Sequence, residues 1–375
     1  MLKINKLILV FVLWGVFFMP FNSYKGLSFL GEFSKDSSTL FFIVAFLALV
    51  IQSMVSGKLK VPLNNPLFQV FILFNLWIFI SLLLNIPEIS SYYFKKTTGF
   101  NRAFRQYFVL FLSGVVFLMT YYNAFSNTTG KQLFFKIRKV IFYSFVVVSV
   151  YALIEVLILK LKMSGLLPVL EVFDYFPFTE VYVDFRNSRI SSVTFEPPAL
   201  ATYLFTIAGW MFSYIITGNG LKKYIPAILT IFFAVVSGSR AALVIIFLQF
   251  LIFLLLLVNK KHFKKLIKIL EYTFIIIVIV FLIKGKTISN YVLESVTSFE
   301  IQDDVHAVSN KSRFGIQYTN FQVFLKNPIL GTGLGQQTFV AKDMYPKWAT
   351  EDNWEFRHLY LNEEVKSFPP GYNIY

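Results

Sequence analysis

The sequence has no cysteine, and its 375 residues include only three histidines. The absence of cysteine excludes disulfides and thiolate metal sites. The histidines are far apart, at His262, His306 and His358, which argues against a histidine-rich metal site. No phosphate-binding glycine loop of the nucleotide-binding kind is present, and this disfavours an ATP-driven machine. We therefore expect a protein that uses neither a metal nor another cofactor.

Charged residues are also few, at 15% of the chain, whereas 56% of the residues are hydrophobic and the mean hydropathy is +0.64. These values differ from those of a soluble domain and predict an all-α, polytopic membrane protein. A helix of roughly 17 to 25 apolar residues can cross the bilayer. We expect about nine such helices, at residues 5–21, 38–55, 66–86, 104–122, 139–159, 197–217, 224–239, 241–258 and 266–283.

Acidic residues are missing from the connections that would lie on the N-terminal side of the membrane. These connections contain 15 basic residues, enough to account for the formal net charge of +15. By the positive-inside rule this side is cytoplasmic, so the charge does not indicate a nucleic-acid partner. The chain then divides into membrane helices at 1–159, an extracytoplasmic loop at 160–196, membrane helices at 197–283 and a large extracytoplasmic segment at 284–375.

One arginine, Arg240, interrupts an apolar stretch that runs from Tyr224 to Val258 without another charge. The stretch would be about 50 Å long as one helix, too long for a single crossing. The sequence VVSGSRAALVIIFLQF offers a turn at Ser237–Ser239. We therefore expect Arg240 at a tight extracytoplasmic turn between two membrane helices, where an arginine can also simply reach the lipid headgroups.

The outer segments contain further polar residues at the membrane surface. The stretch DFRNSRISSVTFEPPALATYL contains Asp184, Arg186, Arg189 and Glu196, and its prolines suit the first turn of a helix. The tail predicts an amphipathic helix from about Lys311 to Lys326, followed by a glycine-rich turn. Guanidinium groups can bind phosphate oxygens through two parallel hydrogen bonds, as a site for a membrane-anchored diphosphate requires.

These residues together resemble the O-antigen ligase and polymerase family of bacterial membrane glycosyltransferases. The resemblance rests on SGSR at the start of a membrane helix, on FEPPALA entering the preceding one, and on the pattern R-x(14)-P-x-x-G-x-G-x-G from Arg313 to Gly335. It covers roughly residues 185–375. It implies an enzyme of the bacterial inner membrane that moves a glycan from an undecaprenyl-diphosphate carrier to an acceptor hydroxyl, without a nucleotide sugar or metal.

Transfer from a lipid diphosphate builds negative charge on the leaving group and removes a proton from the acceptor. We expect Arg240 and Arg313 to stabilise that charge and Glu196 to act as general base, although Glu196 at a helix N-terminus can also simply favour the helix dipole. The residues expected to bind substrate are Arg186, Arg189, Gly331, Gly333, Gly335 and Asn373. A second outer basic cluster, suited to acidic lipid headgroups or to substrate, comprises Lys95, Lys96, Arg102 and Arg105.

Two departures from the family pattern refine this interpretation. Ligases typically have a histidine before an asparagine near the end of the large outer loop, where this chain has Tyr372 and Asn373. This favours a polymerase of O-antigen, capsule or exopolysaccharide repeat units, with a flippase and a chain-length regulator as partners. The family usually continues into further membrane helices, so we expect a truncated chain. The alternatives are an O-antigen ligase, a transporter of lipid-linked oligosaccharide, and a non-catalytic fragment.

Overall fold

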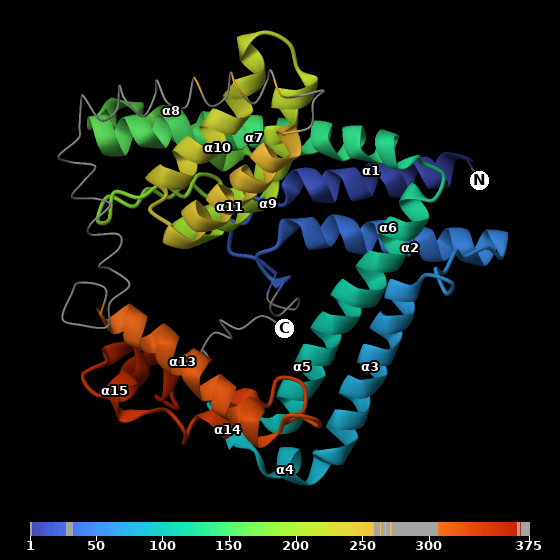
Figure 1. Ribbon diagram of the computed structural model, residues 1–375, viewed down its shortest axis with the longest axis vertical. Helices are drawn as coiled ribbons and strands as arrows, with labels where there is room; N and C mark the ends of the chain where they lie inside the picture. The colour runs from blue at the N-terminus through green and yellow to red at the C-terminus, as the bar shows by residue number, and fades with distance from the viewer. Residues whose placement is uncertain are drawn as a thin grey trace. The chain divides into compact units, whose positions relative to one another are not determined.

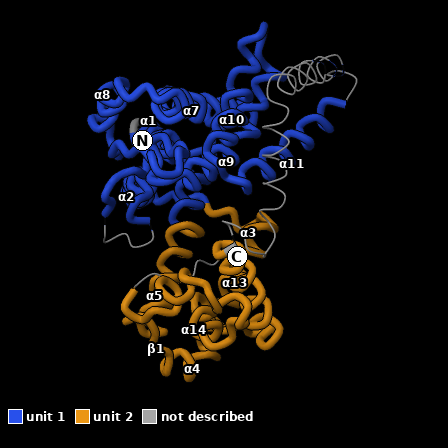
Figure 2. The backbone as a smooth tube through the Cα atoms, turned by 90° about the vertical axis from the view of Figure 1, so that its left-hand side faces the viewer, with its two compact units in different colours: residues 1–60, 116–280 blue, residues 61–115, 281–375 orange. Residues whose placement is uncertain are grey.

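The computed structural model describes residues 2–27, 33–258 and 307–365, together with residues 263, 267, 271 and 368. Within these residues the secondary structure is helical except for one two-stranded hairpin and two isolated bridges (Figure 1). The chain forms two compact units, coloured separately in Figure 2. Unit 1 comprises Met1–Lys60 and Val116–Val280, and unit 2 comprises Val61–Val115 and Phe281–Tyr375.

The described helices confirm an all-α, polytopic integral membrane protein. Six helical segments are long and apolar enough to cross a membrane. Two other expected crossings correspond to the shorter helices α1 (Leu2–Phe18) and α10 (Ile225–Val236). The ninth, 266–283, lies largely outside the described residues. The six long segments are α2 (Ser37–Ser56), α3 (Pro66–Leu84), the continuous run from α5 to α6 (Gly99–Phe125), α7 (Gly130–Leu161), α9 (Pro197–Thr217) and α11 (Arg240–Leu257).

In unit 1, α9 packs against α7, α10 and α11, and its buried face supplies much of the core. Leu204 and Phe212 from this face are almost completely buried, as are Phe145 of α7 and Phe233 of α10. Helix α7 begins with a capping box, in which the Thr129 side chain accepts from the backbone N–H of Gln132. Between α7 and α9 lie three short helices: η3 (Ser164–Leu166), α8 (Leu167–Glu171) and η4 (Val172–Tyr175).

The turn expected at Ser237–Ser239 is present in the structure. Helix α10 ends at Val236 and α11 begins at Arg240. Between them Gly238 has a φ of +67°, a left-handed conformation that glycine adopts without a Cβ clash. Ser239 is the N-cap of α11, and its side chain accepts a hydrogen bond from the backbone N–H of Ala242. These two residues place Arg240 in the first turn of a membrane helix.

Unit 2 combines α3 and α5 (Gly99–Phe111) with the C-terminal part of the chain. Between α3 and α5 lie α4 (Ile86–Ser91) and the hairpin of β1 (Tyr93–Phe94) and β2 (Thr97–Thr98). The amphipathic helix expected at 311–326 corresponds to α13 (Ala307–Lys326). Against α13 pack α14 (Gln337–Ala341), α15 (Lys347–Thr350) and the π-helix η6 (Glu355–Tyr360), through a core that contains Ile316, Ala349 and Phe356.

Candidate functional site

The turn before Arg240 is in direct contact with the loop that precedes α9. The Nε of Arg189 donates a hydrogen bond to the carbonyl oxygen of Ser237 at 2.7 Å. The same nitrogen would lie 3.0 Å from a Cβ placed on Gly238, so this glycine permits the close approach. Arg189 and Arg240 are both half-buried. Unit 1 therefore brings two of the predicted arginines to one turn.

Asp184 organises the loop that contains Arg186 and Arg189. Its carboxylate accepts hydrogen bonds from the backbone N–H of Asn187 at 3.0 Å and from the Asn187 side chain at 2.9 Å. Asp184 also forms an isolated antiparallel bridge with Arg189. The hydrogen bonds from Asn187, helped by the nearby charge of Arg189, lower the pKa of Asp184. Arg186, between these residues, is exposed to solvent.

Acidification is expected to loosen this loop. Because the folded state lowers the pKa of Asp184, its contribution to loop stability is present above its unfolded pKa of about 4 and is lost as the pH falls through the folded value. A spin label on Phe185→Cys in this cysteine-free chain should gain mobility at acidic pH. In the Asp184→Asn background the label should show no such transition; a transition that persists would contradict the assignment.

Glu155 of α7 is a functional candidate that the sequence interpretation missed. It is fully buried, and its carboxylate accepts hydrogen bonds from the backbone N–H of Ser192 at 2.8 Å and of Ser191 at 3.0 and 3.2 Å. The Ser191 hydroxyl donates a further bond at 3.4 Å. An acidic residue within a membrane helix is costly, and such residues commonly mark functional sites. It is the only acidic residue of the stretch 139–159, and this was the available signal.

Glu196 is the N-cap residue of α9 and lies at a cavity of about 360 Å³. Its side chain is exposed and makes no capping hydrogen bond. The backbone N–H of the neighbouring Phe195 donates to the Asn22 side chain at 3.0 Å, which ties this segment to the end of α1. Polar groups in the cavity wall include Asn22, Thr202 and Thr206. A carboxylate among hydroxyl and amide groups can accept a proton from a sugar hydroxyl.

The predicted glycine turn lies in unit 2, where Gly331, Gly333 and Gly335 all have positive φ. The Arg102 Nε donates to the carbonyl oxygen of Gly335 at 2.7 Å. A Cβ on Gly335 would lie 2.5 Å from Cγ of Gln106, so the turn packs closely on α5. The structure thus shows a packing requirement for glycine here. Arg313, exposed on α13, belongs to the same unit.

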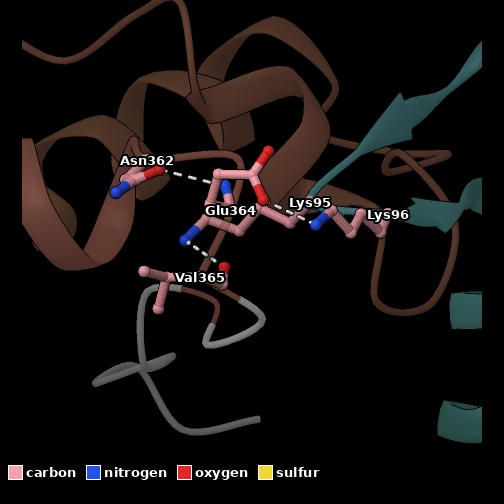
Figure 3. A network of polar contacts seen from close by, with 5 residues as sticks. All are labelled: Lys95, Lys96, Asn362, Glu364 and Val365. Carbon is pink, nitrogen blue, oxygen red and sulfur yellow. Dashed lines mark hydrogen bonds and ion pairs between the residues drawn. The ribbon is translucent and has the colours of Figure 1, made fainter.

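Two lysines of the predicted basic cluster bind η6 and the chain segment after it; Figure 3 shows the contacts with the segment after η6. Lys95 and Lys96 occupy the two-residue turn of the β1–β2 hairpin, with φ of 52° and 58°. The buried Lys95 Nζ donates to the carbonyl oxygens of Leu359 and Val365, and burial lowers its pKa. Lys96 forms an ion pair with Glu364 at 2.6 Å. These contacts give both lysines a structural role.

Across the described ranges 2–27, 33–258 and 307–365, no group of three or more histidine and acidic side chains is arranged to bind a metal ion. The predicted substrate residue Asn373 lies outside the described residues. Arg240 and Arg313 belong to different units, and each is described only within its own unit.

Residues 225–362 match a family model described as O-Antigen ligase. This segment starts at α10, contains the turn before Arg240, and ends just after η6. Over this segment the chain is similar to the O-antigen ligase family. No curated protein and no solved structure matches the chain. The match confirms the resemblance drawn from SGSR and the glycine pattern, and it supports a membrane enzyme of the O-antigen ligase and polymerase type.

The O-antigen ligase match includes Arg240, Arg313 and the three glycines, begins after the other described candidate residues and ends before Asn373. Glu155, Arg189 and Glu196 lie upstream of residue 225. Of these, Arg189 is connected to the matched segment by its hydrogen bond to Ser237. The turn at Ser237–Ser239 therefore lies in the matched segment and also contacts Arg189.

Proposed function

We propose that the chain is a polymerase of undecaprenyl-diphosphate-linked repeat units of O-antigen, capsule or exopolysaccharide. It transfers the growing glycan to an acceptor sugar hydroxyl on the extracytoplasmic side of the bacterial inner membrane, with the N-terminus in the cytoplasm. The observation that supports the proposal is the hydrogen bond of Arg189 to the turn before Arg240, because this turn lies in the segment that matches the family model. Two half-buried guanidinium groups at a membrane-helix terminus suit an anionic diphosphate.

The proposed reaction needs no metal or nucleotide sugar. The acceptor oxygen attacks the anomeric carbon, the bond from that carbon to the diphosphate breaks, and the lipid diphosphate leaves with the electron pair. Arg240 and Arg189 stabilise the developing charge of the diphosphate, because preorganised donors act most strongly where charge forms in the transition state. Glu196 takes the proton of the acceptor hydroxyl. Arg186 contributes to substrate binding.

The alternative is an O-antigen ligase, which is favoured by the description of the matching family. The two reactions share the lipid-linked donor and differ in the acceptor: a repeat unit for a polymerase, and lipid A core for a ligase. The tyrosine at position 372, where ligases typically have histidine, supports the polymerase. A flippase would supply the donor, and a chain-length regulator would set the length of the product.

Complementation separates these two functions. Expression of the chain in a polymerase-null strain should restore a ladder of long surface polysaccharide on a gel, whereas a ligase-null strain carrying its own polymerase should remain without polymer on lipid A core. If the chain restored polymer on lipid A core in the ligase-null strain and did not restore long polysaccharide in the polymerase-null strain, it would be a ligase and the polymerase assignment would be wrong. Restoration in neither strain, with the chain present in the membrane at the level of a tagged control enzyme, would reject both activities for this chain.

A further inference from the structure

Arg138 of α7 is a buried arginine that the proposed reaction does not use. Its residue surface is only 9% exposed, and no carboxylate of the described residues lies within ion-pair distance. The Nη1 donates to the hydroxyl oxygens of Thr217 at 2.7 Å and Ser213 at 3.2 Å, both on α9. A buried charge without a counter-ion is costly, so an anion from outside the chain would stabilise it.

Aromatic rings lie close to the guanidinium. The Cζ of Arg138 is 4.2 Å from the ring centroid of Tyr214, 4.8 Å from that of Phe135 and 5.4 Å from that of Phe134. Cation–π contacts of this kind orient the planar group. Its hydrogen bonds to Thr217 and Ser213 use Nη1, and the Tyr214 side chain is a third partner, whereas a guanidinium has five N–H donors. These three partners leave N–H donors of the guanidinium for a phosphate oxygen.

The charge pattern around this guanidinium is one-sided. Arg138 contacts Thr217 at the C-terminal end of α9, and η5 (Leu221–Tyr224) follows directly. The backbone and Cβ of Lys223 lie close to Gly218, next to Thr217. The sequence has no acidic residue in 126–154 or in 197–270. Basic residues in these ranges near the ends of α7 and α9 are Lys131, Lys136, Lys139, Lys222 and Lys223.

We propose that Arg138 and the lysines of η5 form a binding site for the phosphate of an anionic phospholipid headgroup. The position favours a lipid over free phosphate, because the site lies at the ends of two membrane helices, where headgroups are at high local concentration. Juxtamembrane basic residues each add to the attraction of an anionic surface. The site is independent of the proposed polymerase reaction and lies at the opposite end of α9 from Glu196.

The test is lipid binding by the full chain in nanodiscs. Bound phosphatidylglycerol and phosphatidylcholine are counted by native mass spectrometry after exchange into discs with equal amounts of both. The wild-type chain should retain phosphatidylglycerol in about tenfold preference, the size of effect that one charge-assisted bidentate pair can supply. Arg138→Gln, which keeps a hydrogen-bonding side chain without the charge, should lose most of this preference. Arg138→Lys should keep only part of it, because lysine lacks the paired donors.

Lys139→Gln is the matched control, since it removes a neighbouring charge from the same helix and should leave the preference largely unchanged. An equal count of the two lipids on the wild-type chain would overturn the proposal, as would an unchanged preference in Arg138→Gln. Adding inorganic phosphate to discs of phosphatidylcholine alone tests whether the site binds free phosphate instead of a lipid headgroup. If it raises the melting temperature of the wild-type chain as much as phosphatidylglycerol does, the site binds free phosphate and the lipid assignment is wrong. Arg138→Lys keeps the test valid if Arg138→Gln fails to fold.

Discussion

Arg240→Ala is expected to lower kcat/KM for glycan transfer from the lipid-linked donor by about 10²- to 10³-fold, the usual effect of removing one preorganised donor from a charge-stabilising site. Arg240 begins α11 beside a turn that also contacts Arg189, so its loss removes charge from the position proposed for the diphosphate. Arg240→Lys should recover only part of the activity, because an ammonium group lacks the planar pair of donors. The measurement is transfer of labelled repeat units by the purified chain in lipid vesicles.

The control for Arg240 is a charge removed elsewhere in the same unit. Lys58→Ala suits this purpose because Lys58 is exposed in the connection between α2 and α3. Its expected effect on transfer is less than about threefold, as for most surface substitutions. If Arg240→Ala polymerised at the wild-type rate while the chain bound its donor normally, Arg240 would be a helix-end residue at the lipid headgroups, and the proposed site would be wrong.

Glu155→Gln should have the second largest effect on activity, acting through Arg189. The carboxylate of Glu155 accepts the backbone N–H groups of Ser191 and Ser192, so it fixes the loop two residues after the arginine. A glutamine offers one acceptor oxygen and places an amide donor against these N–H groups. We expect KM for the lipid-linked donor to rise about tenfold or more, with a smaller change in kcat, since the loop would still reach the bound diphosphate.

A double-mutant cycle separates positioning from general destabilisation. If Glu155 acts through Arg189, the combined Glu155→Gln and Arg189→Ala variant should be little worse than Arg189→Ala alone. Fully additive losses would show that Glu155 supports the fold and has no specific effect on the arginine. A spin label at Phe185→Cys supplies a readout without catalysis, and it should become more mobile in Glu155→Gln whether or not the polymerase proposal holds.

The helices of unit 1 were predictable because their signals are local. Apolar stretches of bilayer length and the turn residues between Val236 and Arg240 act over a few positions, and the structure places α10 and α11 accordingly. The same applies to α13, whose end at Lys326 follows from the asparagine and proline after it. The match at residues 225–362 agrees with the family drawn from these short motifs.

The contacts that build the candidate site were not predictable in this way. Arg189 meets Ser237 across 48 positions, and Glu155 meets Ser191 across 36. Each contact depends on how α7, α9 and α10 pack, and a single sequence does not encode partners at that separation in any periodic pattern. The role of Lys95 was hidden for the same reason, because its acceptors Leu359 and Val365 belong to the far end of the chain.

The composition of unit 2 from two distant segments, Val61–Val115 and Phe281–Tyr375, has a consequence for biogenesis. The ribosome makes the intervening 165 residues, Val116–Val280 of unit 1, before the second segment of unit 2. During this time α3 and α5 lack the glycine turn that packs on α5 in the finished chain. Bringing the two segments of unit 2 together has an entropic cost that rises with the length of the chain between them. Until they meet, the incomplete unit exposes the surface that the second segment later covers. Pulse-labelled nascent chains should therefore acquire protease resistance in unit 1 before unit 2.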